Sequence, residues 1–401
     1  MDPLTTGSQK GDTLKILKNR QLAALLIHTS ASLLITTGMA DAQTATITII
    51  DDPQIYGVTA AWDVTPDGSM VVGVSEGRVF RYTSAGGVEI MSPQDYQHTA
   101  KATVSDDGSV LVSTVEDPGG IFSPAYWTQA TGWVTVGGIP GQPSLDGQYG
   151  SGWDVSGDGA KMVGLAWDGS NGKAEAFQWT DATGVVGLGR TADRNSRASV
   201  ISADGHVIGG FYEDPTTGCR RPVRWIDAGA PDLFLGDSVC GETKGFTRTG
   251  AYITGEAAFA GDFWYNGFLY SDAGGVIKLP PAVNNVNYRS MGISVSEGGI
   301  VVGRSGLGGQ TLFASIWYPG DERMRDLADE LTSLGADPGD WWLLSAIAIT
   351  PDGATIVGQA FNSITSQYGA FIATIPGSTV FNDDFEDGTT DAWSAVSGGG
   401  R

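Results

Sequence analysis

The ten residues VSGDGAKMVG, Val155 to Gly164, decide the fold because the chain repeats them. Close copies occur as ISADGHVIGG at Ile201 to Gly210 and as ITPDGATIVG at Ile349 to Gly358. Seven copies end 40 to 55 residues apart, at Gly73, Ser113, Gly164, Gly210, Gly255, Gly303 and Gly358. A period of this length predicts a propeller or a solenoid.

Each copy predicts four strands, named a to d here in chain order. The Asp-Gly pair lies between two apolar runs and predicts a hairpin turn between strands a and b. Gly takes a positive φ without steric cost, and Asp bonds to the turn backbone. Acidic turns of this kind can also bind calcium, but the copies FTRTG (246–250) and VSEGG (295–299) lack the acids that such a loop needs.

Strand c carries an aromatic residue at one repeated position. Large rings that recur at one structural position predict packing between neighbouring units rather than a ligand site. The residues are Tyr82, Trp127, Trp179, Trp225, Tyr270 and Trp317, and the seventh copy has Ala373 in their place.

Seven four-stranded units predict an all-β fold, a seven-bladed β-propeller spanning residues 43–376. The seventh copy ends after strand c, whereas a spare β segment, Thr44 to Asp51, precedes the first copy. We expect this N-terminal strand to complete the last blade and close the ring. One short helix is predicted in the sixth repeat, from Met324 to Leu334, with Gly335 as its stop.

The amino terminus predicts a signal peptide, residues 1–42. Three basic residues within 15–20 precede an apolar run, which ends in the small-residue site Ala-Asp-Ala at 40–42. A membrane anchor is the alternative, but His28, Thr29 and Ser30 interrupt the apolar run. We expect cleavage after Ala42, no integral membrane segment in the mature chain, and a secreted or cell-surface location, extracellular or periplasmic.

The net charge of −22 bears on partners. Such an acidic surface repels phosphate backbones and anionic lipids, so nucleic acid is not an expected partner. Acidic side chains also keep a protein soluble, and this explains the charge without any specific cationic partner. No phosphate-binding loop or metal-ligand motif is present, so we expect no cofactor and no metal.

The alternation of V-S-x-D-G-x-x-V-V-G with A-F-x-W-T-x-x-x-G resembles the bacterial HAF-type extracellular repeat, over roughly Tyr56 to Pro376. The insert at 324–353 resembles the helical stretch often found before the last repeat of that family. Departures are Ser113 where Gly is usual, the FTRTG turn, and Ala373. The resemblance implies export and a repeat scaffold, and it carries over no activity and no catalytic residue.

Residues 377–401 are predicted to form a flexible acidic tail. Within it FNDDFEDGTTDAWS, Phe381 to Ser394, resembles a short tail at the carboxyl end of various secreted proteobacterial proteins. It is also similar to the first strand of some concanavalin-like sugar-binding modules. The segment is too short to form a domain.

Propeller geometry places the b–c and d–a connections on one face, called the top face here. Cys219 and Cys240 both belong to top-face connections and are the only cysteines of the chain. In an exported protein they predict one disulfide. Long top loops also hold aromatic residues that could stack on sugar rings, namely Tyr149, Trp167, Trp264, Tyr265 and Trp341.

Two classes of function remain open at this point. The first is an exported non-catalytic binding or interaction module for an extracellular glycan or protein, acting as a monomer; a structural cell-surface protein is not separable from it. The second is a carbohydrate-active enzyme such as a polysaccharide lyase, with His98 and Tyr96 as candidate acid and base. The Trp-Asp pairs at Trp62 and Trp153 fall in strand a, not where a WD repeat places them.

Overall fold

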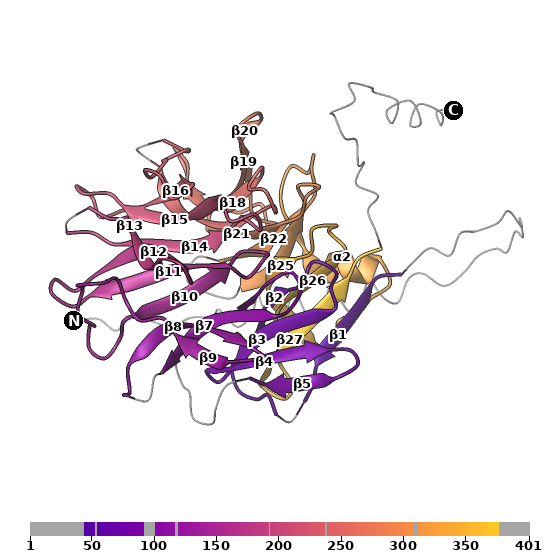
Figure 1. Cartoon of the computed structure of the whole chain (residues 1–401). Coiled ribbons are helices and arrows are strands. Elements are labelled where there is room, and N and C mark those ends of the chain that lie inside the picture. Colours follow the sequence, from indigo (N-terminus) through magenta and orange to yellow (C-terminus); the bar gives the residue numbers. More distant parts are fainter. Residues whose placement is uncertain are drawn as a thin grey trace, which may run out of the picture. The chain divides into compact units, whose positions relative to one another are not determined.

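The computed structural model describes residues 44–52, 54–91, 101–116, 119–191, 193–236, 239–307 and 312–376. All of them belong to one compact unit, Gln43–Arg401. They form seven antiparallel sheets arranged as a seven-bladed β-propeller (Figure 1), which confirms the fold class predicted from the repeats. The predicted signal peptide and acidic tail lie outside the described residues.

The first three blades each have four strands, which follow chain order from strand a at the centre to strand d at the rim. Blade 1 contains β2 (Thr59–Val64), β3 (Met70–Ser75), β4 (Arg78–Thr83) and β5 (Gly87–Ile90). Blade 2 contains β6 (Thr103–Val104), β7 (Val110–Glu116), β8 (Phe122–Thr128) and β9 (Gly132–Thr135). Blade 3 contains β10 (Gly150–Val155), β11 (Lys161–Asp168), β12 (Lys173–Thr180) and β13 (Gly184–Gly189).

Blades 5 and 6 repeat this order. Blade 5 contains β17 (Cys240–Phe246), β18 (Ile253–Ala258), β19 (Asn266–Ser271) and β20 (Gly275–Leu279). Blade 6 contains β21 (Tyr288–Val295), β22 (Val301–Leu307), β23 (Leu312–Trp317) and β24 (Arg325–Asp326).

Blade 4 has three strands in the described part of the chain: β14 (Ser196–Ile201), β15 (Val207–Glu213) and β16 (Arg220–Ile226). The four strands predicted for every copy are therefore not all present here, because in the described part of this copy the segment where strand d was expected, 231–236, forms only a single bridge, between Arg224 and Asp232. Pro231 offers no N–H to a ladder. The chain also turns back at once, because Gly236 N donates to Leu233 O at 2.7 Å.

Blade 7 is completed from the other end of the ring. Its strands β25 (Trp341–Ile349), β26 (Thr355–Asn362) and β27 (Gln367–Thr374) are joined by the N-terminal β1 (Thr46–Ile50). Strand β1 pairs antiparallel with β27 from Thr46 opposite Thr374 to Ile50 opposite Ala370. The N-terminal strand therefore closes the propeller, as the spare β segment predicted.

The helix of the sixth repeat is shorter than predicted. Helix α2 spans Leu327–Ser333 and buries Leu327 and Leu331, whereas the sequence suggested a start at Met324. The start is later because Arg325–Asp326 form the edge strand β24, and Asp326 then caps the helix by accepting from Ala328 N at 2.9 Å. Gly335, at φ +93°, follows the helix end.

The repeated turn is a small hydrogen-bonded unit. In blade 3, Ser156 Oγ donates to Asp158 Oδ1 at 2.6 Å, and Lys161 N donates to Ser156 Oγ at 3.0 Å. Gly159 lies at φ +71°, a conformation that favours glycine. These requirements explain why Ser or Thr, Asp and Gly recur in this order.

The glycine that ends the motif has a different role. Gly164 lies opposite Phe177, which is fully buried, and a Cβ on Gly164 would stand 2.1 Å from Ser151 O and 2.7 Å from the Phe177 ring. In blade 2 the equivalent Ser113 lies opposite Ala125 instead. The departure at Ser113 is therefore compensated by a small partner in strand c.

The core is divided among the joints between blades, where apolar residues of adjacent sheets pack together. Trp225 is fully buried and Trp317 nearly so, as packing residues should be. Trp179 is half-buried and stacks on Tyr126 of the preceding blade, with ring centroids 4.9 Å apart. The aromatic residues of strand c thus serve inter-blade packing, more deeply in some blades than in others.

Candidate functional site

The innermost strands bulge toward the propeller axis. In β2 the register shifts between Ala61 and Asp63, and in β10 it shifts between Gly152 and Asp154, so that Trp62 and Trp153 are extra residues. A bulge re-aims a side chain while the rest of the ladder stays paired. Six bulge residues, one from each innermost strand except β6, line one axial cavity: Trp62, Trp153, Ser199, Lys244, Ile293 and Ile347.

The axial cavity has a volume of about 410 Å³. Its wall is chemically uneven, because the bulge residues of blades 1 and 3 are tryptophans, that of blade 5 is Lys244, and those of blades 6 and 7 are Ile293 and Ile347. Cavities of a few hundred cubic ångströms that combine apolar walls with a few polar groups are typical of small-molecule sites.

One end of the cavity is bounded by the turns between strands a and b. Successive turns are joined there by backbone hydrogen bonds: Asp106 N donates to Gly157 O at 2.9 Å and Gly157 N to Ala203 O at 2.8 Å. An ion pair between Asp106 of blade 2 and Arg248 of blade 5 crosses this end. A ligand would therefore reach the cavity from the top face.

Asp63 and Asp154 follow the two bulged tryptophans and bind the next blades. Asp63 accepts from Val64 N at 2.9 Å and from Val104 N of blade 2 at 3.0 Å. Asp154 accepts from Ile201 N of blade 4 at 2.9 Å. The Trp-Asp pairs of strand a therefore hold neighbouring innermost strands together.

The environment raises the pKa of both carboxyl groups. Burial, and next the charge of Asp154, raise the pKa of Asp63 to about 7, although Lys101 opposes them. Burial also raises the pKa of Asp154, again against Lys101. A buried carboxylate is disfavoured relative to its neutral form unless a cation compensates it.

A cationic cluster surrounds Glu242 in blades 4 and 5. Glu242 is buried and forms ion pairs with Arg197, with Lys244 at 3.0 Å and with Arg220 at 3.5 Å. Burial alone would raise the pKa of Glu242, but Lys244 and Arg197 outweigh it and hold the pKa at about 2. The Arg197 guanidinium also lies 3.9 Å from the Trp153 ring centroid, a cation–π contact.

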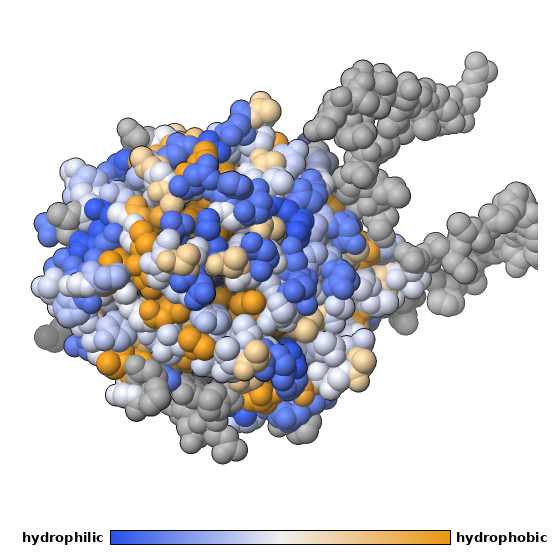
Figure 2. All heavy atoms as spheres, in the orientation of Figure 1, coloured by the Kyte–Doolittle hydropathy of each residue, from blue (hydrophilic) through white to orange (hydrophobic). Residues whose placement is uncertain are grey.

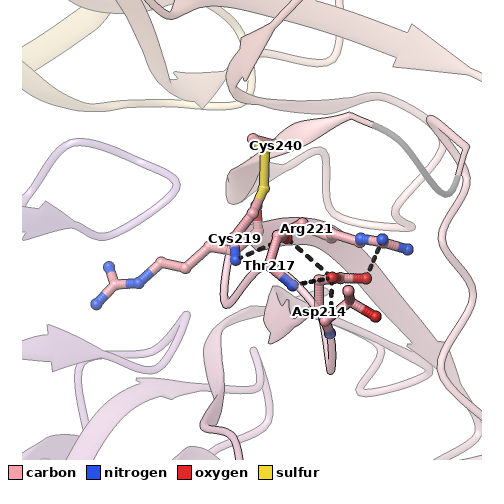
Figure 3. Close-up of a disulfide and its surroundings, with 7 residues drawn as sticks. Asp214, Thr217, Cys219, Arg221 and Cys240 are labelled. Carbon is pink, nitrogen blue, oxygen red and sulfur yellow. Dashed lines mark hydrogen bonds and ion pairs between the residues drawn. A yellow bond between two sulfur atoms is a disulfide. The ribbon is translucent and has the colours of Figure 1, made fainter.

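The structure joins Cys219 and Cys240 in a disulfide (Figure 3), with Cα atoms 5.7 Å apart. Cys219 precedes β16, and Cys240 begins β17, so the bond links blades 4 and 5 at the top face. The loop before Cys219 is held by Asp214, which accepts from Thr217 N at 2.6 Å and from Arg221 (Figure 3). The disulfide lies directly beside Arg220 in sequence and therefore borders the Glu242 cluster.

The candidate ligand-binding aromatics are not gathered in one place. Tyr149 and Trp167 are half-buried neighbours in blade 3, where Trp167 N donates to Tyr149 O at 2.8 Å. Trp264 and Tyr265, also half-buried, lie in the b–c connection of blade 5. Trp341 begins β25 and packs against the core between blades 6 and 7, so it is not a loop residue.

The candidate catalytic residues His98 and Tyr96 lie outside the described residues, so their proposed role stays a prediction. His206, which directly precedes strand b of blade 4, is an exposed residue whose Nδ1 lies 2.5 Å from Asp227 Oδ1. Within the described part of the chain, His, Cys, Asp and Glu side chains form no cluster that could hold a metal ion.

Sequence reasoning missed an exposed aromatic row on the top face of blade 7. Trp342 and Tyr368 are exposed, and both rings contact Phe361, at centroid distances of 6.4 and 5.0 Å. Ile364, 71% exposed, lies in the adjoining turn. Figure 2 shows one face of the molecule, on which hydrophobic residues (orange) are interspersed with hydrophilic ones (blue).

No protein-family model matches the chain, and no curated protein matches it. Solved propeller structures are similar in fold. An oligogalacturonate lyase in complex with manganese is 12% identical with a TM-score of 0.53, over 85% of this chain and 100% of that chain. The β-propeller domain of the Trilobed protease from Pyrococcus furiosus is 11% identical with a TM-score of 0.53, over 79% of this chain and 95% of that chain. At such identities the likeness shows the propeller fold alone.

Proposed function

We propose that this chain is an exported, non-catalytic binding propeller of the HAF-repeat kind, and that an extracellular glycan enters its axial cavity from the top face. The observation that carries the proposal is the cavity itself. Two half-buried tryptophans, Trp62 and Trp153, line it beside charged groups, and the Asp106–Arg248 pair crosses its far end. Indole rings stack on the apolar faces of sugar rings, while the charged groups can bind hydroxyls.

The axial cavity is a better site than the top-loop aromatics considered from sequence. Trp341 is committed to the core, and Tyr149 and Trp264 belong to blades 3 and 5, in separate connections. The cavity instead draws residues from all seven blades into one enclosure. A binding function on the exposed row of blade 7 would suit a protein partner and is the second form of this proposal.

Export is supported by the disulfide between Cys219 and Cys240, because such bonds persist in oxidising compartments. No helix among the described residues is long and apolar enough to cross a membrane. The predicted signal peptide would direct the chain to export. The net charge of −22 favours neutral or cationic partners over polyanions.

A binding role fits Asp63 and Asp154 better than catalysis does. Both carry raised pKa values, which is typical of general acids and bases. However, their oxygens accept backbone N–H groups of the next blades, so the carboxyl groups are held as structural links. The lyase alternative depends on His98 and Tyr96, together with the fold likeness to an oligogalacturonate lyase.

The proposal is tested on the secreted protein with a glycan array, followed by calorimetry on the oligosaccharides that bind. Trp153→Ala should weaken binding by at least about tenfold, because it removes both the stacking surface and the support for Arg197. Trp264→Ala is the matched control and should bind as the unmodified protein does. Absence of any glycan binding would contradict the proposal, and unsaturated products from uronate polymers would establish the lyase alternative.

A further inference from the structure

The Glu242 cluster, of which Arg197, Lys244 and Glu242 line the axial cavity, holds more cationic groups than Glu242 can pair. Glu242 faces three of them, Arg197, Lys244 and, outside the cavity lining, Arg220. Glu256 of β18 adds a second carboxyl group nearby, but burial raises its pKa despite Lys244. The cluster therefore retains positive charge within a protein whose net charge is −22.

Arg304 of β22 extends this cluster and lines the cavity. Its guanidinium makes no hydrogen bond or ion pair with any described residue, although Glu256 acts on it electrostatically. Burial lowers the pKa of Arg304, since Glu256 compensates it only in part and Arg289 adds a like charge. A half-buried guanidinium without a direct partner is costly, and an anion that docks against it recovers that cost.

Lys101 of blade 2 is a second cavity cation without a side-chain hydrogen bond or ion pair to the described residues. The acids that act on it, Asp63 and Asp154, point their oxygens at backbone N–H groups. Because the pKa of Asp63 is about 7, its carboxyl group is only partly charged at neutral pH. Lys101 therefore remains available to a ligand.

Besides these cations, the cavity has apolar side chains against which the body of a ligand could pack. Ile293 and Ile347 line the cavity at the bulges of blades 6 and 7, and Met291 lies close by in β21. Trp62 lines it from blade 1. The cavity thus presents cations and apolar surfaces to one small volume.

We propose that the axial cavity binds a small organic carboxylate, whose anionic group pairs with Arg304 and whose ring or apolar body lies against Ile347 and Trp62. This inference rests on the proposed binding function and names the charge class of its ligand. The carboxylate group could belong to an acidic sugar such as glucuronate or to a non-sugar acid such as benzoate. Testing each compound separately distinguishes these two ligands.

The test is isothermal titration of the full secreted chain with sodium glucuronate, sodium benzoate and, as the neutral comparison, glucose. At least one acid should bind, and glucose should bind at least about tenfold more weakly, as expected when a charge-assisted hydrogen bond is lost. Raising the NaCl concentration from about 0.05 to about 0.5 M should lower the affinity of the protein for the acid. Binding of glucuronate alone would identify an acidic sugar, and binding of benzoate alone a non-sugar acid.

Three variants locate the site. Arg304→Gln should lower the affinity for the acid by at least about tenfold. Arg304→Lys keeps the charge and should retain part of the affinity. Arg81→Gln is the matched control, because Arg81 pairs with Glu89 at 2.7 Å on the outer strands of blade 1. If Arg304→Gln does not fold, the acid affinities of Arg304→Lys and Arg81→Gln are compared instead. The proposal predicts a lower affinity in Arg304→Lys and an unchanged affinity in Arg81→Gln.

Equal affinity for glucose and the acids, or no binding of either acid, would overturn the carboxylate proposal. These outcomes differ from failure of the proposed function. If the protein binds neutral glycans on the array and Arg304→Gln binds them equally well, the binding function would be supported and the anion site would not. If the protein binds benzoate, Arg304→Gln does not, and no glycan binds, the anion site would be supported and the glycan function would not.

Discussion

Asp106 and Arg248, 142 positions apart, form a doubly hydrogen-bonded ion pair, Oδ1 to Nη1 at 2.9 Å and Oδ2 to Nη2 at 2.5 Å. They come from the a–b turns of blades 2 and 5, on opposite sides of the ring. Arg248 also donates its backbone N–H to Glu297 of blade 6 at 2.6 Å. The pair therefore ties the turns together where the cavity ends.

A double-mutant cycle with Asp106→Asn and Arg248→Gln should give a coupling free energy of about 0.5–1 kcal/mol, because both side chains are partly exposed. The coupling should shrink in 1 M salt, a condition in which the Debye length is about 3 Å. Urea unfolding of the four proteins measures it. A coupling of zero at low salt would show that the pair does not hold the turns.

Strand β1 is predicted to contribute stability through its inward face. Ile49 packs against the core between blades 6 and 7, whereas the neighbouring Thr48 is exposed. Ile49→Asp should lower the free energy of unfolding by roughly 2–4 kcal/mol, since it places a charge against apolar side chains. Thr48→Asp, the matched control, should cost less than about 1 kcal/mol. Equal losses in the two variants would argue against closure by β1.

The disulfide closes a sequence separation of 21 residues between Cys219 and Cys240. Replacing both by Ser should lower the free energy of unfolding by about 3 kcal/mol on the chain-entropy estimate. Urea unfolding of the oxidised protein and the double variant gives the difference. Two free thiols in the secreted protein, counted by mass spectrometry, would refute the bond.

Asp63 and Asp67 should affect the pH dependence of stability in opposite directions. Asp63, with its pKa raised to about 7, binds its proton more tightly when folded. Its favourable contribution is complete below the unfolded pKa of about 4 and is lost as the pH rises toward 7. Asp63→Asn should therefore gain stability relative to the unmodified protein between pH 5 and about pH 8.

Hydrogen bonds from Ser69 and Thr65 lower the pKa of Asp67 to about 2. Its contribution is present above pH ~4 and is lost as the pH falls through about 2. Asp67→Asn should therefore be less stable than the unmodified protein at pH 7 and approach it in acid. Urea unfolding at several pH values compares the two variants, and parallel pH profiles would contradict both assignments.

The ring was predictable because its determinants recur. The turn that begins at Ser156 uses Ser or Thr, Asp and Gly, which recur in five of the seven copies, and a residue pattern repeated along a chain is visible in one sequence. The β1 closure was predictable for the same reason, since the seventh copy lacks a strand that Thr46–Ile50 supplies. The shortened blade 4 was not anticipated, because Pro231 acts within a segment that otherwise reads as a strand.

The candidate site was much less predictable. The cavity is lined by bulge residues, and Trp62, Ser199 and Ile347 share a structural position without sharing chemistry. A bulge has no signature in a single sequence, so these residues read as ordinary strand positions. The Arg304 environment likewise depends on Glu256 and Arg289, which come from other strands.

The central claim is that ligand binds inside the axial cavity, and a cavity-filling substitution tests it most directly. Ile347→Trp adds a large ring to the apolar wall without removing any charged group, and Ile364→Trp adds the same ring to an exposed turn on the top face. Both variants are titrated calorimetrically with the ligand bound by the unmodified protein, after their melting temperatures have shown that they fold. The account predicts no detectable binding to Ile347→Trp and unchanged binding to Ile364→Trp, whereas unchanged binding to a folded Ile347→Trp would contradict it.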